Sequence, residues 1–151
     1  MLLLIYSLTF VKTAEMQKLH IPSTRNTPEI LFSPSENIFF IRGTSSPEDV
    51  RALYYPVIDW IKIFVDDVIE GQLPFFKKEP VKFQVDLVYF NSSSAKFLFD
   101  IFSELKRLIL GDAKVLVHWI FDPEDPDQKE AGADIASLVE MEFIFVQKKT
   151  S

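Results

Sequence analysis

The sequence contains no cysteine, only four glycines and only two histidines. The missing cysteines exclude disulfides, thiolate nucleophiles and cysteine-ligated metals. With His20 and His118 alone, a multi-histidine metal site is excluded as well. The glycines form neither a Walker loop nor a Rossmann fingerprint, so nucleotide binding of those kinds is not supported. We therefore expect neither a cofactor nor a metal.

The chain also lacks a basic cluster and a long apolar run. Its 22 acidic residues outnumber its 16 lysines and arginines, which argues against binding nucleic acid. The apolar run from Leu2 to Phe10 is far shorter than the ~20 residues of a membrane helix, and no positive charge precedes it as in a secretory signal. We expect a cytoplasmic protein with no nucleic-acid and no membrane partner.

What the sequence does contain is a large apolar fraction. Apolar residues make up 48% of its 151 residues, fifteen of them phenylalanines, and charged residues make up 25%. This composition is typical of one folded domain with a sizeable core. Patterned sequence begins only at Leu19, so we interpret 19–151 as the domain and 1–18 as an N-terminal extension. An extra strand or helix at 1–18 is the alternative.

Alternating and three-to-four-residue apolar spacings predict the elements. Ser46 and Pro47 mark the start of the first helix, and Pro56 predicts a kink or break in it. The segment 81–90 becomes wholly apolar toward its end, which is typical of a strand in the middle of a sheet. The predicted strands are 28–33, 37–43, 81–90, 114–121 and 141–147, and the predicted helices are 46–71, 92–110 and 126–140. We expect an α/β fold, a single layered domain whose mixed sheet has about five strands and about three main helices.

Catalysis by serine is not supported. The sequence has no Gly-x-Ser-x-Gly elbow. His118 lies in the middle of a predicted strand and His20 precedes the first one, so neither is an evident base for a serine nucleophile. We expect no enzymatic activity.

An acidic stretch, FDPEDPDQKE, carries Asp122, Asp125 and Asp127. It lacks the central glycine and terminal glutamate of a calcium loop. Two prolines and an acidic first helical turn are typical of a solvated loop between a strand and a helix. A docking surface for a partner protein is the other interpretation.

The stretch YFNSSSAK, residues 89–96, has two interpretations. Asn91 or Ser92 can cap the helix that follows, which requires only one such residue. A serine hydroxyl here would also lie at the carboxyl end of a central strand and at the positive end of a helix, where it is well placed for modification.

Several motifs together resemble the SiaC family of bacterial regulatory phosphoproteins, which are relatives of the STAS domains of anti-sigma factor antagonists. The resemblance covers about residues 19–147 and rests on the following motifs: LHIPSTRNTPEI, YYPVIDWI, VYFNSSSAKFLFDIF, VHWIFDPEDPDQKEAG and FIFV.

The resemblance implies a STAS-like fold and a partner-switching protein without catalysis of its own. In such families a dedicated kinase phosphorylates a threonine or serine at the start of this helix, a PP2C-type phosphatase reverses the reaction, and the unmodified form activates a diguanylate cyclase. The acceptor falls on Ser92, where threonine is commoner, with Ser93 as the runner-up. The implied partner-binding residues are Asn91, Ser92, Ser93, Ser94, Asp122, Asp125 and Asp127.

Two other functions remain open at this point. A STAS-like antagonist would bind a regulatory kinase of a sigma-factor system and no cyclase. A small-molecule binding module would use the phenylalanine-rich interior. A pull-down that recovers a sigma-regulating kinase would favour the antagonist, and one that recovers a cyclase would favour the cyclase regulator. A co-purifying ligand would favour the small-molecule binding module.

Overall fold

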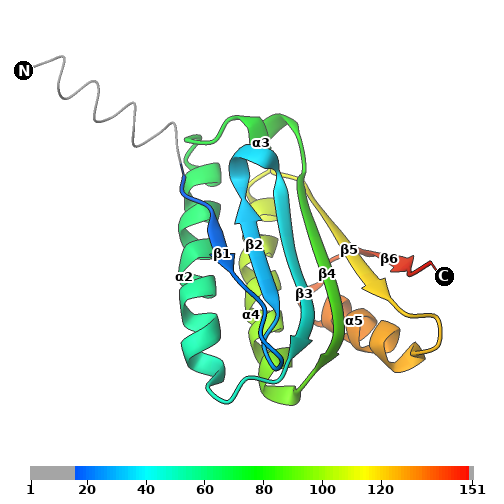
Figure 1. The fold of residues 1–151 in the computed structure, drawn as a ribbon. Helices are drawn as coiled ribbons and strands as arrows, with labels where there is room; N and C mark the ends of the chain where they lie inside the picture. Colours follow the sequence, from blue (N-terminus) through cyan, green and yellow to red (C-terminus); the bar gives the residue numbers. More distant parts are fainter. Residues whose placement is uncertain (1–15, 150–151) are drawn as a thin grey trace, which may run out of the picture.

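The computed structural model describes residues 16–149 and contains one six-stranded sheet with its helices (Figure 1). The predicted α/β class is confirmed, and the sheet has one strand more than expected. Most of the predicted extension at 1–18 lies outside the described residues. The elements are β1 (Leu19–Ile21), β2 (Glu29–Ser33), η1 (Pro34–Glu36), β3 (Ile38–Ser45), α2 (Val50–Ile69), α3 (Phe75–Lys78), β4 (Val81–Phe90), α4 (Ser92–Leu110), β5 (Val115–Phe121), α5 (Pro126–Val139) and β6 (Phe143–Gln147).

The strands lie side by side in chain order, from β1 to β6. The first three pair antiparallel, and β3, β4, β5 and β6 pair parallel. The ends of these four parallel strands therefore meet at one edge of the sheet, which we call the carboxyl edge. The helices α2, α4 and α5 each connect one parallel strand to the next one in the sheet. Because such connections are right-handed and all run from β3 toward β6, the three helices lie on the same face of the sheet.

Three details of the prediction were wrong. The strand β1 was not predicted, because its three residues are too few for an alternating pattern. The helix α2 begins at Val50 and not at Ser46, and Asp49 is its cap because its carboxylate accepts from the Ala52 N–H. Of the kink or break predicted at Pro56, the break does not occur, because Pro56 is exposed and the carbonyl that lacks an N–H partner can face water.

The phenylalanines fill the space between the sheet and the helices. The ring of Phe39 lies 5.1–6.4 Å from the rings of Phe32, Phe64, Phe76 and Phe83, and all five are almost fully buried. Rings in mutual contact leave no room for a ligand among them, so the aromatic core stabilises the fold and does not form a binding chamber.

The opposite face of the sheet is open among the described residues. Along β4 the buried residues Val81, Phe83 and Val85 alternate with exposed Lys82 and Gln84. The strand β4 lies in the middle of the sheet, as its apolar end predicted, but only one of its faces is covered by helices.

A β-bulge changes the end of β4. Leu87 pairs with Gly43 and Tyr89 pairs with Thr44, which leaves Val88 as the extra residue. Val88 is 63% exposed and Tyr89 is 54% exposed. The apolar end of β4 thus faces solvent beside the start of α4.

Candidate functional site

The first turn of α4 is held at the carboxyl edge by Asn91. Its side-chain oxygen accepts from the Ser94 N–H at 2.9 Å, which makes Asn91 the helix cap. Its own N–H donates to Ser45 O at the end of β3, at 3.0 Å. The Ser93 hydroxyl donates to the same Asn91 oxygen at 3.1 Å. Because Asn91 provides the cap, Ser92 is not needed for it.

The three serines occupy different environments. Ser92, the first residue of α4, is exposed, and its hydroxyl has no hydrogen-bond partner among the described residues. Ser93 is exposed and bonded only to Asn91. Ser94 is 0% exposed. Of the three hydroxyls, that of Ser92 is the one that is both accessible and unengaged.

Ser94 belongs to a buried chain of hydroxyls. The Ser45 hydroxyl donates to Ser94 Oγ at 2.8 Å, and Ser94 Oγ donates to Ser45 O at 3.1 Å. The Tyr54 hydroxyl lies 2.6 Å from Ser45 Oγ and is the remaining donor in this chain. The chain joins α2, β3 and α4 in the interior, so the start of α4 has little freedom to move.

Burial raises the pKa of the Tyr54 hydroxyl, an effect that hydrogen bonding to Ser45 and Ser94 partly opposes. An unfolded tyrosine ionises near pH ~10. The folded protein holds this proton more tightly, so its contribution to stability is complete below about pH 10 and falls as the pH rises toward the folded pKa. We expect the free energy of unfolding to drop between about pH 9 and about pH 11, and to drop less in Tyr54→Phe. Urea unfolding across this range checks it, and equal slopes in both proteins would refute it.

The predicted acidic residues lie at the same edge, after the neighbouring strand β5. Asp122 is exposed, and its carboxylate accepts from the Glu124 N–H at 2.9 Å. Asp125 caps α5 by accepting from the Gln128 N–H at 3.3 Å. Asp127 is exposed in the first turn of α5. The Gln128 amide donates to Leu87 O of β4, which fixes the start of α5 against the strand that precedes Asn91.

Two exposed aromatic residues near the serines were not singled out from the sequence. Tyr89 precedes Asn91 by two residues and is turned outward by the bulge. Tyr55, on the exposed side of α2, is 53% exposed and packs edge-on against Phe97 of α4. The exposure of Tyr55 was predictable, because Tyr55 lies outside the three-to-four-residue apolar spacing of its helix. The exposure of Tyr89 was not predictable, because nothing in the sequence indicates the bulge.

Among the described residues there is neither a serine–histidine pair nor a cluster of possible metal ligands. None of their serine hydroxyls is hydrogen-bonded to a histidine: His20 pairs with Glu29 at 3.0 Å, and His118 lies within β5. No group of three possible metal ligands occurs among them. Within residues 16–149, moreover, no helix combines the length and the apolarity that crossing a membrane requires.

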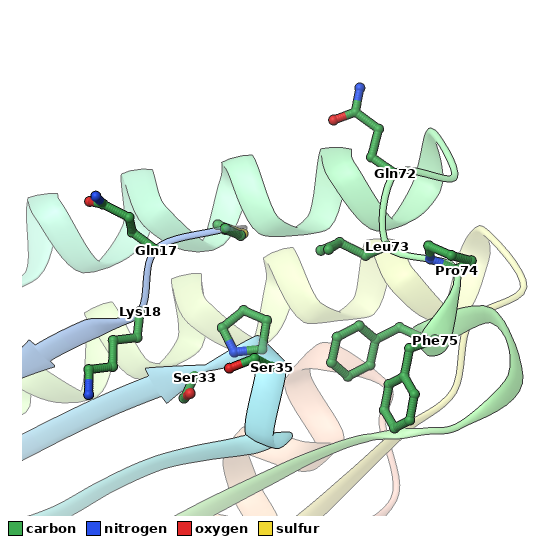
Figure 2. A pocket seen from close by; sticks show the side chains of 11 residues that line it. Gln17, Lys18, Ser33, Ser35, Gln72, Leu73, Pro74 and Phe75 are labelled. Carbon is green, nitrogen blue, oxygen red and sulfur yellow. The ribbon is translucent and has the colours of Figure 1, made fainter. Parts of the chain in front are cut away.

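An open pocket of about 530 Å³ lies at the other edge of the sheet. Figure 2 shows it between the turn at Ser33 and Ser35, the segment from Gln72 to Phe75, and Gln17 at the start of the described chain. These segments precede β3 and β4, whereas Ser92 follows β4. The pocket is therefore far from the serines and has no part in the site described above.

A family model and the solved structures agree on one family. A model of the SiaC family of regulatory phosphoproteins matches residues 21–148. An uncharacterised protein of Pseudomonas aeruginosa strain UCBPP-PA14 is 34% identical over 107 residues, which are 71% of this chain and 78% of that protein. The crystal structure of apo-SiaC from P. aeruginosa superposes with a TM-score of 0.73 at 28% identity, covering 89% of this chain and 100% of that chain. A chain in the crystal structure of the P. aeruginosa diguanylate cyclase SiaD with its activator SiaC superposes with a TM-score of 0.75 at 27% identity. The match covers 86% of this chain and 99% of that chain.

Proposed function

The chain belongs to the SiaC family of regulatory phosphoproteins, and from this we propose that it switches a diguanylate cyclase through reversible phosphorylation of Ser92. The unmodified form binds and activates the cyclase, and the phosphorylated form does not. The complex between SiaD and its activator SiaC supports the choice of partner. The protein has no catalytic activity of its own; a protein kinase and a PP2C-type phosphatase act on it in the cytoplasm.

The observation that carries the proposal is the state of the Ser92 hydroxyl. It is exposed at the first position of α4 and unbonded, while Asn91 caps the helix. A kinase can reach such a hydroxyl without opening the fold. Ser93 remains the second candidate, because it is also exposed. Ser94 drops out as an acceptor, and its side chain no longer belongs to the proposed surface, because it is 0% exposed.

The size of the electrostatic effects decides how such a phosphate would act. It adds about −1.5 to −2 charges, and the helix dipole favours it by roughly 0.3–1 kcal/mol, up to ~2 kcal/mol in good geometry. Reversing a two-state equilibrium from 1:99 to 99:1 needs ~5.5 kcal/mol. The dipole is too weak for that and favours the helix already present, so phosphorylation does not change the fold.

An interface responds much more strongly. Burying a poorly paired dianion against a partner costs several kcal/mol. Lys96, four residues after Ser92 and therefore on the same side of α4, is held by Asp100 at 2.8 Å. A phosphate on Ser92 would compete for this lysine and change the charge pattern that a partner meets.

We place the cyclase-binding surface on the carboxyl edge of the sheet around the start of α4. It comprises Asn91, Ser92, Ser93, Tyr89, Asp122, Asp125 and Asp127. The exposed ring of Tyr89 supplies the apolar contact that the polar residues lack, as aromatic residues commonly do at protein interfaces.

Phosphosite mass spectrometry on the protein purified from its native host tests the proposal. We expect phosphate on Ser92, its loss on treatment with a PP2C-type phosphatase, and a diguanylate cyclase that co-purifies only with the unmodified form. Phosphate on neither Ser92 nor Ser93 in any growth condition would contradict it.

A further inference from the structure

The edge strand β6 has an unpaired side. It pairs with β5, and within residues 16–149 no strand lies on its other side (Figure 1). Its sequence, FIFVQ, contains no proline, glycine or charge. Proteins usually protect an exposed edge with such residues, because its free N–H and C=O groups otherwise pair with another strand. The free backbone groups of β6 are therefore available to pair with a strand of another molecule.

The direction of the free backbone groups follows from one hydrogen bond. The Lys148 N–H donates to Phe121 O at 2.8 Å, so Lys148 points its backbone groups toward β5. Backbone direction alternates along a strand. Phe143, Phe145 and Gln147 therefore point their N–H and C=O groups outward, to the free edge.

The side chains of the even-numbered residues form a pattern that is complementary to itself. Glu142, Ile144, Val146 and Lys148 lie on the open face of the sheet. Ile144 is 45% exposed, Val146 is 37% exposed and Glu142 is exposed. When two copies of this strand run antiparallel, the acidic end of one meets the basic end of the other. A parallel arrangement would bring like charges together, which is unfavourable.

We propose that two copies of this chain pair through β6 as antiparallel strands, with the two-fold axis at Phe145. In this register Glu142 faces Lys148 of the second copy and Ile144 faces its Val146. The outward backbone groups of Phe143 then meet those of Gln147 from the second copy, as in the hydrogen-bonded pairs of an antiparallel ladder. A shift by two residues in either direction loses both charge pairs, so the charges select the register.

The charges around the proposed contact are compatible with it. Lys148 lies 2.8 Å from the Asp86 carboxylate of β4, which is 32% exposed. In the dimer the side chain of Lys148 would turn from Asp86 toward the free edge, so that one exposed ion pair replaces another. Lys149 and Glu140, both exposed, extend the basic and the acidic end. His118, on the adjacent strand and opposite Ile144, faces the same side of the sheet.

The pairing leaves the phosphorylation site open. Because the two strands run antiparallel, the carboxyl edges of the two copies point in opposite directions. Ser92 follows β4, two strands away from the contact. The dimer and the proposed cyclase regulation are therefore independent, and either can fail while the other holds.

Sedimentation velocity of the full chain tests the proposal through charge reversal. We expect the wild type to form a species of twice 17.5 kDa. Glu142→Lys alone and Lys148→Glu alone should each raise the dimer Kd by about tenfold or more, because two attractive contacts become repulsive. An equimolar mixture of the two variants should restore the dimer, because every contact between unlike variants then joins a lysine to a glutamate.

A backbone variant tests the strand pairing itself. Gln147→Pro removes an outward N–H and leaves the bonds between β5 and β6 in place, so it should abolish the dimer, while Gln147→Ser should keep it. Thermal melting followed by circular dichroism shows that each variant is folded. A wild type that stays monomeric up to about 1 mM would overturn the proposal. So would a dimer that survives Gln147→Pro, because its contact would then lie on another surface, such as the open face of the sheet.

Discussion

A Ser92→Asp variant is expected to keep its fold and lose its cyclase partner. Ser92 is exposed and the Asn91 cap does not depend on its side chain, so an aspartate fits without rearrangement. At the first position of a helix the dipole favours a negative charge by roughly 0.3–1 kcal/mol. Against a partner, the same charge must be desolvated. We expect the affinity for the cyclase to fall about 100-fold, roughly 3 kcal/mol.

Titration of the purified cyclase with each variant measures this effect. Ser92→Ala is the matched control and should bind and activate like the unmodified protein. Ser93→Asp introduces the same charge one residue further and should weaken binding less. A Ser92→Asp protein that binds as tightly as the wild type would show that the start of α4 is not part of the interface.

A Ser94→Asp variant is expected to lose much of its stability instead. Ser94 is 0% exposed and shares hydrogen bonds with Ser45, which is also buried. A carboxylate in this position is desolvated and faces carbonyl and hydroxyl oxygens, which costs several kcal/mol. We expect the free energy of unfolding to fall by about 4 kcal/mol, a large part of the 5–15 kcal/mol typical of a domain.

For a domain of this size the loss corresponds to a decrease in Tm of about 10–15 °C. Ser94→Ala provides the comparison and should cost about 1–3 kcal/mol, because it removes the two hydrogen bonds that join Ser94 to Ser45, while Ser45 keeps its contacts with Asn91 and Tyr54. Ser92→Asp, two residues away, should change Tm little. A Ser94→Asp protein with the Tm of the wild type would mean that the buried hydroxyl chain does not hold α4 in place.

The sequence was a good guide where regular periodicity met a clear boundary. Asn91 and Gly111 enclose α4, and both ends lie where the apolar spacing put them. The parallel strands β4 and β5 were recognisable by their apolar runs, and their order along the chain brings Asn91 and Asp122 to one edge. The partner-binding role of these residues stays a prediction.

Features that depend on distant contacts could not be predicted. Ser94 precedes Phe97 and Leu98 by three and four residues and so falls on the apolar face of α4, which makes its burial predictable, whereas its hydrogen bond to Ser45 was not. The start of α2 lies at Val50 and not at Ser46, because Asp49 caps it, and both Ser46 and Asp49 are of the residue types that commonly cap helices. The bulge that exposes Tyr89 arises from the register between two strands. The bond between Ser94 and Ser45 and the register of the bulge leave no local signal in the sequence.

The central claim is that one removable phosphate decides docking while the domain stays rigid. Stoichiometrically phosphorylated protein should be titrated against the cyclase, treated with the phosphatase, and titrated again, with circular dichroism recorded at each stage. We expect weak binding before treatment, full binding after it, and the same spectrum throughout. Equal affinity in both states, or a spectrum that changes with the phosphate, would contradict the claim.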